Sequence, residues 1–272
     1  CLELHYDGGK LFLPVENIEL LTRYGSEESS VQLDKLGGLG WQSRKAKMKE
    51  RVREIAAELI RIAASRTLKK TSPVETPAGA YDEFSARFPY QETEDQDRAI
   101  SDVIADFGKG QPMDRLVCGD VGFGKTEVAL RAAFVMAMSG QQVAVVVPTT
   151  LLARQHYKNF TERFSGLPIK IGQLSRFATA KEVAFAKEGL ASGKLDIVVG
   201  THALLAKSIS FKSLGLLIVD EEQHFGVSHK EQLKSIKSGV HVLTLTSTPI
   251  PRTLQLALSG VRDLSLITTA PI

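Results

Sequence analysis

The amino-acid sequence predicts an α/β fold in which a mostly parallel sheet lies between two layers of helices. From Tyr81 onward, short apolar runs rich in β-branched residues alternate with stretches of helical periodicity. The runs are continuously hydrophobic, which is typical of strands covered on both faces and therefore of parallel sheets. The expected strands are 116–118, 143–147, 169–171, 196–199, 216–219, 242–245 and 264–267.

The composition is that of an ordinary globular protein. The 272 residues are 43% hydrophobic and 24% charged. No run approaches the roughly 20 apolar residues that cross a bilayer, so we expect no membrane partner. Cys1 and Cys118 lie far apart and outside any Cys/His cluster, which argues against a zinc site or a disulfide framework and suits a reducing cytoplasm. Because the sequence starts at Cys1 rather than Met, we expect a piece of a longer protein.

Residues 1–40 are expected to form a small β domain, barrel-like and of the SH3 or Tudor type. Residues 2–6 and 10–15 alternate apolar and polar side chains around a turn at residues 7–9, which predicts a β-hairpin. About 40 residues bury little hydrophobic core alone, so the domain is expected to be stabilised by packing against its neighbours or a partner.

Residues 41–70 are expected to form one long linker helix. Apolar residues recur at helical spacing, and ten Lys or Arg side chains between Arg44 and Lys70 make the other faces basic. Such a face could contact nucleic acid or an acidic protein, or could be solvated. Residues 71–80 contain two prolines and a glycine and are expected to be a flexible linker. Residues 81–272 would then form one lobe.

The most informative motif is the octet at residues 119–126, which fits G-x-x-x-x-G-K-[ST]. It follows the run 116–118 and precedes a helix predicted over 127–138. In such a loop, backbone N–H groups curl around phosphate oxygens, and the helix N-terminus adds partial positive charge. Lys125 is expected to reach the β- and γ-phosphates, and Thr126 to hold Mg²⁺. The predicted binding set for a nucleoside triphosphate is Gly119, Asp120, Val121, Gly122, Phe123, Gly124, Lys125 and Thr126.

Two carboxylates follow the apolar run 216–219. Hydrolysis of a nucleoside triphosphate needs one acidic group to hold Mg²⁺ and another to orient or deprotonate the attacking water. Asp220 is placed for the metal and Glu221 for the water. Acids also end strands at ordinary surface loops, but the preceding P-loop favours the functional interpretation.

Several motifs together resemble those of superfamily 2 helicases and translocases, whose motor lobes have a RecA-like fold. Residues 220–223, Asp-Glu-Glu-Gln, resemble the DExx motif. Many relatives have His at the last of these positions, so Gln223 puts in doubt any mechanism that requires an imidazole there. The other matches are residues 88–96 (the Q motif), 148–153 (motif Ia), 200–202 (a further DNA-contacting loop) and 246–253 (motif III).

This resemblance implies an ATP hydrolase that uses Mg²⁺ and moves along double-stranded DNA. It implies that Tyr90, or less directly Phe88, stacks on adenine and that Gln96 bonds the edge of the base; packing of either aromatic ring in the core is the alternative. The implied catalytic residues are Lys125, Asp220, Glu221 and Gln223, with Thr246 and Thr248 coupling nucleotide state to motion.

The resemblance also implies sequence-independent contacts with DNA phosphates. For Arg154 and His202 the alternatives are a solvated helix residue and a histidine that stabilises its loop. The implied contacts are Thr149, Thr150, Arg154, Thr201 and His202.

The segment before the motor lobe resembles the RNA-polymerase-interacting domain of the transcription-repair coupling factor (Mfd) family. In that family the domain binds the β subunit of RNA polymerase, which here makes Ile18, Leu20 and Leu21 candidate contacts; burial of one or more of them in the core is the alternative. The resemblance implies a translocase that displaces stalled polymerase so that excision-repair proteins, which act through domains outside this sequence, can follow.

Two other functions remain open: a RecG-like branched-DNA helicase, which shares the motor motifs, and a non-catalytic nucleotide-gated adaptor. The sequence stops soon after motif III and before the second RecA-like lobe. Since that lobe would supply an arginine finger, we expect this chain alone to bind ATP but to hydrolyse it poorly.

Overall fold

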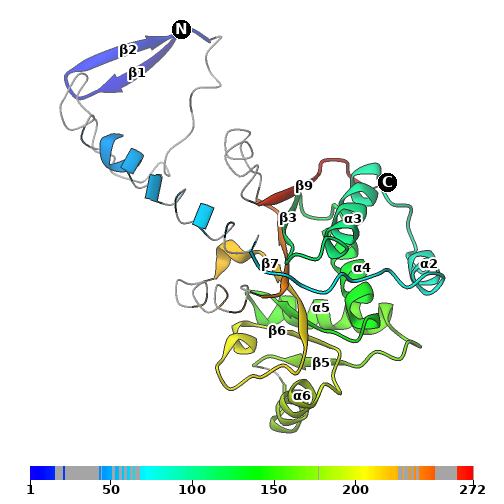
Figure 1. The fold of residues 1–272 in the computed structure, drawn as a ribbon. Coiled ribbons are helices and arrows are strands. Elements are labelled where there is room, and N and C mark those ends of the chain that lie inside the picture. Colours follow the sequence, from blue (N-terminus) through cyan, green and yellow to red (C-terminus); the bar gives the residue numbers. More distant parts are fainter. Residues whose placement is uncertain are drawn as a thin grey trace. The chain divides into compact units, whose positions relative to one another are not determined.

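The structure is a computed structural model that describes two units of the chain. The described residues are 1–15, 21, 43, 45–50, 53–54, 57, 60–61, 64, 68–176, 178–225, 229, 233, 236, 239–248 and 262–271. The chain divides into the units Cys1–Arg61 and Ile62–Ile272, and their elements are labelled in Figure 1.

The first unit begins with the predicted hairpin. Strands β1 (Leu2–Tyr6) and β2 (Gly9–Leu13) pair antiparallel, and Gly8 turns the chain between them with φ 78°. Residues 16–20 and 22–40 lie outside the described residues, so the barrel stays a prediction. Two of the three candidate polymerase contacts, Ile18 and Leu20, fall in these ranges, whereas Leu21 is described and is 38% exposed.

The predicted linker helix is described only in part. Each described residue from Ser43 to Ala64 is helical and exposed. Its apolar stripe was predicted at residues 52, 55, 56, 59, 62 and 63, which lie outside the described residues.

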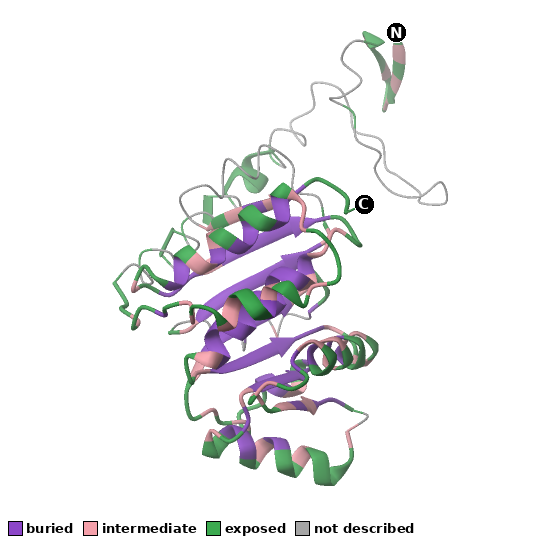
Figure 2. Cartoon of the chain, turned by 90° about the vertical axis from the view of Figure 1, so that its right-hand side faces the viewer, coloured by how far each residue is buried: buried purple, intermediate pink, exposed green. Residues whose placement is uncertain are grey.

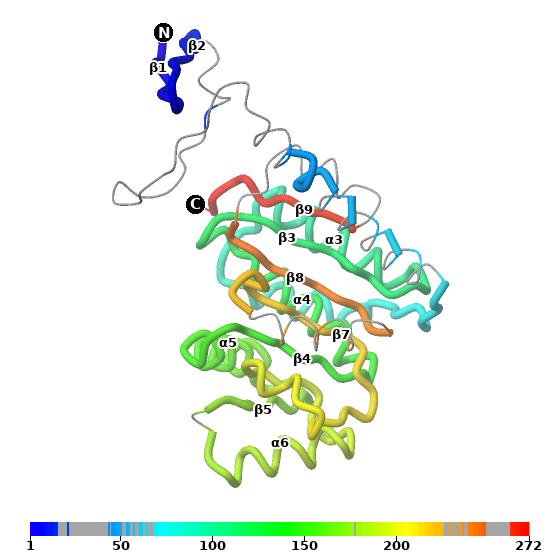
Figure 3. Tube along the Cα trace, turned by 90° about the vertical axis from the view of Figure 1, so that its left-hand side faces the viewer, coloured from blue at the N-terminus to red at the C-terminus, as the bar shows by residue number. Residues whose placement is uncertain are grey.

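The second unit contains one parallel sheet, which confirms the predicted fold class. The strand order is β5-β6-β4-β7-β8-β3-β9, and every pair is parallel. Figure 3 shows β9 and β5 toward opposite ends of this sheet. The strands are β3 (Asp114–Gly119), β4 (Gln142–Val146), β5 (Ile171–Leu174), β6 (Ile197–Gly200), β7 (Leu214–Asp220), β8 (His241–Thr246) and β9 (Asp263–Ile267).

Helices pack on both faces of the sheet, and the continuous apolar runs fill both. In β4, Val143 and Val145 face one hydrophobic cluster, while Ala144 and Val146 face the other. Figure 2 shows the strands buried between the covering elements. The first cluster receives α2 (Ala80–Ala86), α3 (Glu94–Phe107), α4 (Lys125–Met138) and α5 (Thr150–Arg163), and the second α6 (Ala180–Ser192) and the 3₁₀ turn η2 (His202–Leu205). Among the described helices, none is both long and apolar enough for a membrane span.

The strands differ from the predicted ranges by one or two residues at their ends, except β5, and one helix also starts early. Strand β5 starts at Ile171 and continues to Leu174, whereas 169–171 was predicted. As the edge strand it alternates between half-buried and buried residues, so its polar Gln173 is tolerated. Helix α4 starts two residues before the predicted Glu127, because the P-loop runs directly into it.

The expectation that residues 71–80 form a flexible linker is wrong in its first half. The backbone N–H of Thr71 donates to Gly110 O at 3.0 Å, and that of Val74 donates to Phe107 O at 3.0 Å. Val74 is 6% exposed and joins the first hydrophobic cluster. The prolines therefore mark an extended segment packed on the lobe.

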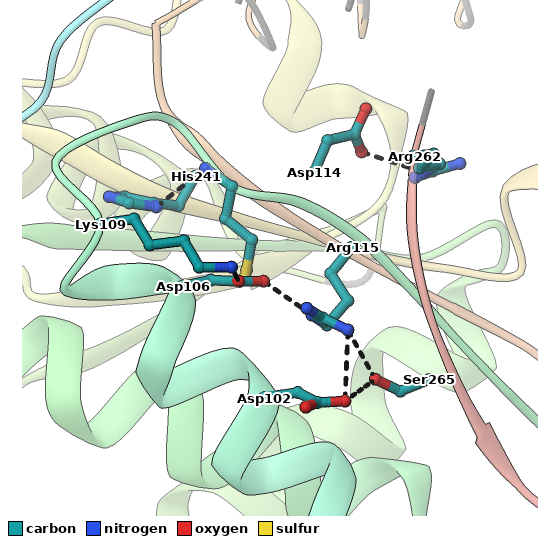
Figure 4. A network of polar contacts seen from close by, with 9 residues as sticks. Asp102, Asp106, Lys109, Asp114, Arg115, His241, Arg262 and Ser265 are labelled. Atoms are coloured by element: carbon teal, nitrogen blue, oxygen red, sulfur yellow. Dashed lines mark hydrogen bonds and ion pairs between the residues drawn. The ribbon is translucent and has the colours of Figure 1, made fainter. Parts of the chain in front are cut away.

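A buried ion pair fastens α3 to the sheet edge (Figure 4). Arg115 Nε in β3 donates to Asp106 Oδ2 in α3 at 2.7 Å, with side chains 8% and 2% exposed. Arg115 Nη1 also donates to Ser265 Oγ in β9 at 2.9 Å and lies 3.3 Å from Asp102 Oδ2. The guanidinium thus joins β3 to α3 and β9 through polar contacts.

Asp106→Asn should lower the free energy of unfolding by about 3–5 kcal/mol, because it leaves a buried guanidinium without its main counter-charge. Asp102→Asn is the matched control and should cost less than about 1 kcal/mol, because that carboxylate is 39% exposed. Urea unfolding followed by far-UV circular dichroism measures both. Equal losses would contradict the importance assigned to the Asp106 pair.

Candidate functional site

The predicted nucleotide residues meet at the carboxyl edge of the sheet. Strands β7, β8 and β3 are neighbours, so the loops that follow them lie side by side. A cleft of about 470 Å³ there is lined by Lys125 and Thr126 from the P-loop, Asp220 and Glu221 after β7, and Ser247 after β8. The structure therefore brings the P-loop and the DExx acids together.

The P-loop uses glycine where other residues would not fit. Gly122 and Gly124 have φ 85° and 78°, which favour glycine. A Cβ on Gly124 would lie 2.2 Å from Gln96 Nε2. The loop is thus shaped both by its left-handed residues and by the close approach of α3.

Lys125 is a buried cation, 8% exposed. Its Nζ donates to Gly119 O at 2.6 Å and to Asp120 O at 2.8 Å. Burial lowers the pKa of Lys125 from its ordinary value, and the charges of Glu221 and Asp220 oppose that shift. None of the described carboxylates forms a direct ion pair with it, so a phosphate oxygen would stabilise this ammonium.

The oxygen donors in the cleft fit a magnesium ion. The Thr126 hydroxyl and the Asp220 carboxylate line the same cleft, and Mg²⁺ prefers such oxygen ligands. Asp220 Oδ2 lies 2.9 Å from Nε2 of His156 in α5. The described residues contain no cluster of three His, Cys, Asp or Glu that could hold a metal ion, so the site would depend on Thr126, Asp220 and the phosphates themselves.

Glu221 has an unusual backbone. Its φ of 53° is positive, alone among the non-glycine residues described, and such strain concentrates at functional sites. Its Oε1 accepts from the backbone N–H of Ser247 at 2.9 Å and from the Ser247 hydroxyl. Its Oε2 accepts from Gln223 Nε2. The carboxylate is thereby fixed between the DExx loop and motif III.

Gln223 connects to the predicted coupling residues. Its Nε2 donates to Thr248 Oγ1 at 3.1 Å, and Thr246 Oγ1 donates to its Oε1 at 3.4 Å. The Thr248 backbone N–H also donates to Thr246 Oγ1 at 3.1 Å. An amide therefore links the DExx loop to motif III, so this link needs no imidazole at position 223. The rest of motif III, residues 249–253, lies outside the described residues.

A second cleft, of about 730 Å³, lies beside the P-loop where the base was expected. Tyr90 is 66% exposed on its wall, which rules out core packing for this ring. Phe88 is half-buried and packs edge-on against Tyr90 at 5.6 Å between centroids. The two aromatic residues are thus available for stacking, as predicted, although the stacking itself stays a prediction.

Gln96 makes two contacts that the sequence analysis did not predict. Its side chain is 1% exposed. Its Oε1 accepts from the Thr93 backbone N–H at 2.9 Å, which completes a capping box at the start of α3. Its Nε2 donates to Phe123 O in the P-loop at 2.8 Å. Gln96 also lines the base cleft. In this structure its amide supports the P-loop, and a bond to the edge of the base stays a prediction.

Four of the five predicted DNA contacts line a third cleft, of about 650 Å³. These are Thr149, Thr150, Thr201 and His202, at the carboxyl ends of β4 and β6. Arg154 is exposed on α5 and is not among the lining residues. Burial, and then the neighbouring His229 and Arg176, lower the pKa of His202. His202 stacks on His229 at 4.3 Å.

Sequence reasoning missed several residues of these clefts. Arg176 and Lys187 supply positive charge to the third cleft. His156 and Asn159 line the triphosphate cleft, and Arg163 lines the base cleft. The α5 residues recur at helical spacing after motif Ia, a pattern that could have placed them on one face. Arg176 and Lys187 belong to no recognised motif, so no sequence signal pointed to them.

Comparisons with known proteins agree with this geometry. The DEAD/DEAH box helicase family matches residues 93–257. The proteins named transcription-repair-coupling factor from Rickettsia prowazekii and from Bacillus subtilis are each 53% identical to this chain over 99% of its length. The protein of that name from Haemophilus influenzae is 51% identical to it over 96% of its length. The chain spans about a quarter of the length of these relatives: 24%, 23% and 23%.

Solved structures give the same fold. RecG bound to a three-way DNA junction aligns with a TM-score of 0.70 at 31% identity, covering 96% of this chain and 35% of that one. The DEAD-box helicase Mss116 bound to ssRNA and UDP-BeF aligns at 0.55 and 15% identity, over 74% of this chain and 46% of that one, which supports the fold alone. The chain belongs to the DEAD/DEAH box helicase family, and its sequence corresponds nearly end to end to one segment of the transcription-repair-coupling factors.

Proposed function

We propose that this chain is the ATP- and Mg²⁺-binding lobe of a double-stranded DNA translocase. The observation that carries the proposal is the single cleft that unites Lys125 and Thr126 with Asp220 and Glu221. A buried ammonium that no described carboxylate pairs with directly, facing oxygen donors for a cation, fits a magnesium–triphosphate complex.

Each residue of the cleft would have its own role in binding and hydrolysing the nucleotide. Lys125 would exchange its carbonyl contacts for phosphate oxygens, and Thr126 and Asp220 would hold the magnesium ion. Bound magnesium neutralises charge that develops on the phosphates. Glu221 would orient or deprotonate the attacking water, and Gln223, with Thr246 and Thr248, would relay the state of the cleft to motif III.

The third cleft would hold the DNA backbone. Hydroxyls of Thr149, Thr150 and Thr201 can donate to phosphate oxygens without reading bases, as a sliding motor requires. Because its pKa is lowered, His202 would act as a neutral hydrogen-bonding group. The positive charge would come from Arg176 and Lys187, and Arg154 would contact DNA only outside this cleft.

The identity with transcription-repair-coupling factors supports a role for the whole protein. In that role, a bacterial cytoplasmic translocase would bind the β subunit of a stalled RNA polymerase, displace it and open the lesion to excision-repair proteins. The small β domain and its following helix would supply the polymerase contact. The alternative is a RecG-like branched-DNA helicase, which the 31% identity to RecG supports less strongly.

Lys125→Ala should weaken binding of a fluorescent ATP analogue about ten- to a hundredfold, because a charged hydrogen bond to phosphate is worth about 1.5–3 kcal/mol. Fluorescence titration in the presence of Mg²⁺ measures this. Lys158→Ala, on the exposed side of α5, is the control and should bind like the wild type. Unchanged affinity in Lys125→Ala would refute the proposed site.

Leu21→Arg should reduce retention of the RNA polymerase β subunit about tenfold or more, because burying an unpaired guanidinium in an interface is costly. A pull-down with purified β subunit measures it. Nucleotide affinity should not change, and Lys125→Ala should retain the β subunit fully. If the wild-type chain fails to retain β subunit yet binds branched DNA tightly, the RecG-like alternative is correct.

A further inference from the structure

One buried histidine lies in the triphosphate cleft and was assigned no role above. His156 is in the second turn of α5 and is 6% exposed. Its Nε2 lies 2.9 Å from Asp220 Oδ2. This contact joins residues 64 positions apart, and it falls on the carboxylate expected to hold the magnesium ion.

The surroundings of the imidazole fix its proton. His156 Nδ1 is buried and has no hydrogen-bond partner among the described residues. An ionised carboxylate can only accept hydrogen bonds. Nε2 therefore carries a proton and donates it to Asp220 Oδ2.

We propose that His156 is a positioning residue for the magnesium ligand Asp220. By donating to Oδ2 it fixes the rotamer of the carboxylate, and no described residue hydrogen-bonds the other oxygen, Oδ1. A single donor at Oδ2 orients the carboxylate and leaves Oδ1 open to the cation. Hydrogen-bonded partners of metal ligands typically raise metal affinity about 10–100-fold. The inference rests on the proposed function.

The test compares binding of a fluorescent ATP analogue with saturating Mg²⁺ and with EDTA. His156→Ala should lose about tenfold in affinity with Mg²⁺ and nothing with EDTA. His156→Gln, whose amide nitrogen can reach the place of Nε2, should recover most of the loss. His156→Asn, which is polar but too short, should not. The Gln and Asn variants keep the test decisive if the alanine variant fails to fold.

Each result decides a different point. Equal loss with Mg²⁺ and EDTA would make the histidine a purely structural residue and overturn the proposal. Unchanged affinity with Mg²⁺ in both His156→Ala and His156→Asn would also overturn it. If the wild-type chain binds no nucleotide under either condition, the proposed function falls and this inference with it.

Discussion

The buried ammonium of Lys125 is the constraint on which the nucleotide cleft depends. A parallel sheet places the loops after β3, β7 and β8 at one edge, and the sequence puts a cation in the first loop and two acids in the second. Burial disfavours the charged lysine, and the acids favour it. The lysine and the two acids therefore stabilise one another electrostatically without a direct ion pair among the described residues, although Lys125 and Asp220 are 95 residues apart in the sequence. A triphosphate with its metal would add charges of both signs and so preserve this balance.

Helix α5 links the three clefts that the strand ends create. Thr149 caps its start, accepting from the Leu152 backbone N–H at 3.2 Å, and lines the proposed DNA cleft. His156 contacts Asp220 in its middle. Arg163 at its end donates to Glu127 Oε1 in α4 at 2.9 Å, two residues after Lys125. The 14-residue helix is about 20 Å long. One helix thus connects the proposed DNA cleft, the proposed cation site and the P-loop helix.

The sequence predicts most of this fold because the relevant signals are local. Continuous apolar runs identify all seven strands, and only the edge strand β5 is misplaced, because its half-exposed pattern carries a weaker signal. The P-loop and the DExx acids are likewise local motifs. The role of His156 is not local, since it depends on which side of α5 faces β7. The packing of Val74 on the lobe was not predicted, because the prolines around it usually indicate a flexible linker.

Gln96 shows how one motif can serve two structural purposes. Thr93 and Gln96 form a capping box, and the same glutamine also supports Phe123 in the P-loop. An amide has two N–H groups and two lone pairs on its oxygen, so one donor and one acceptor position remain. The side chain is 1% exposed, yet Gln96 lines the base cleft. Stacking on the exposed Tyr90 would accept any base, because every base has a π-face. Any preference for adenine over guanine would therefore come from the Gln96 amide and not from the ring.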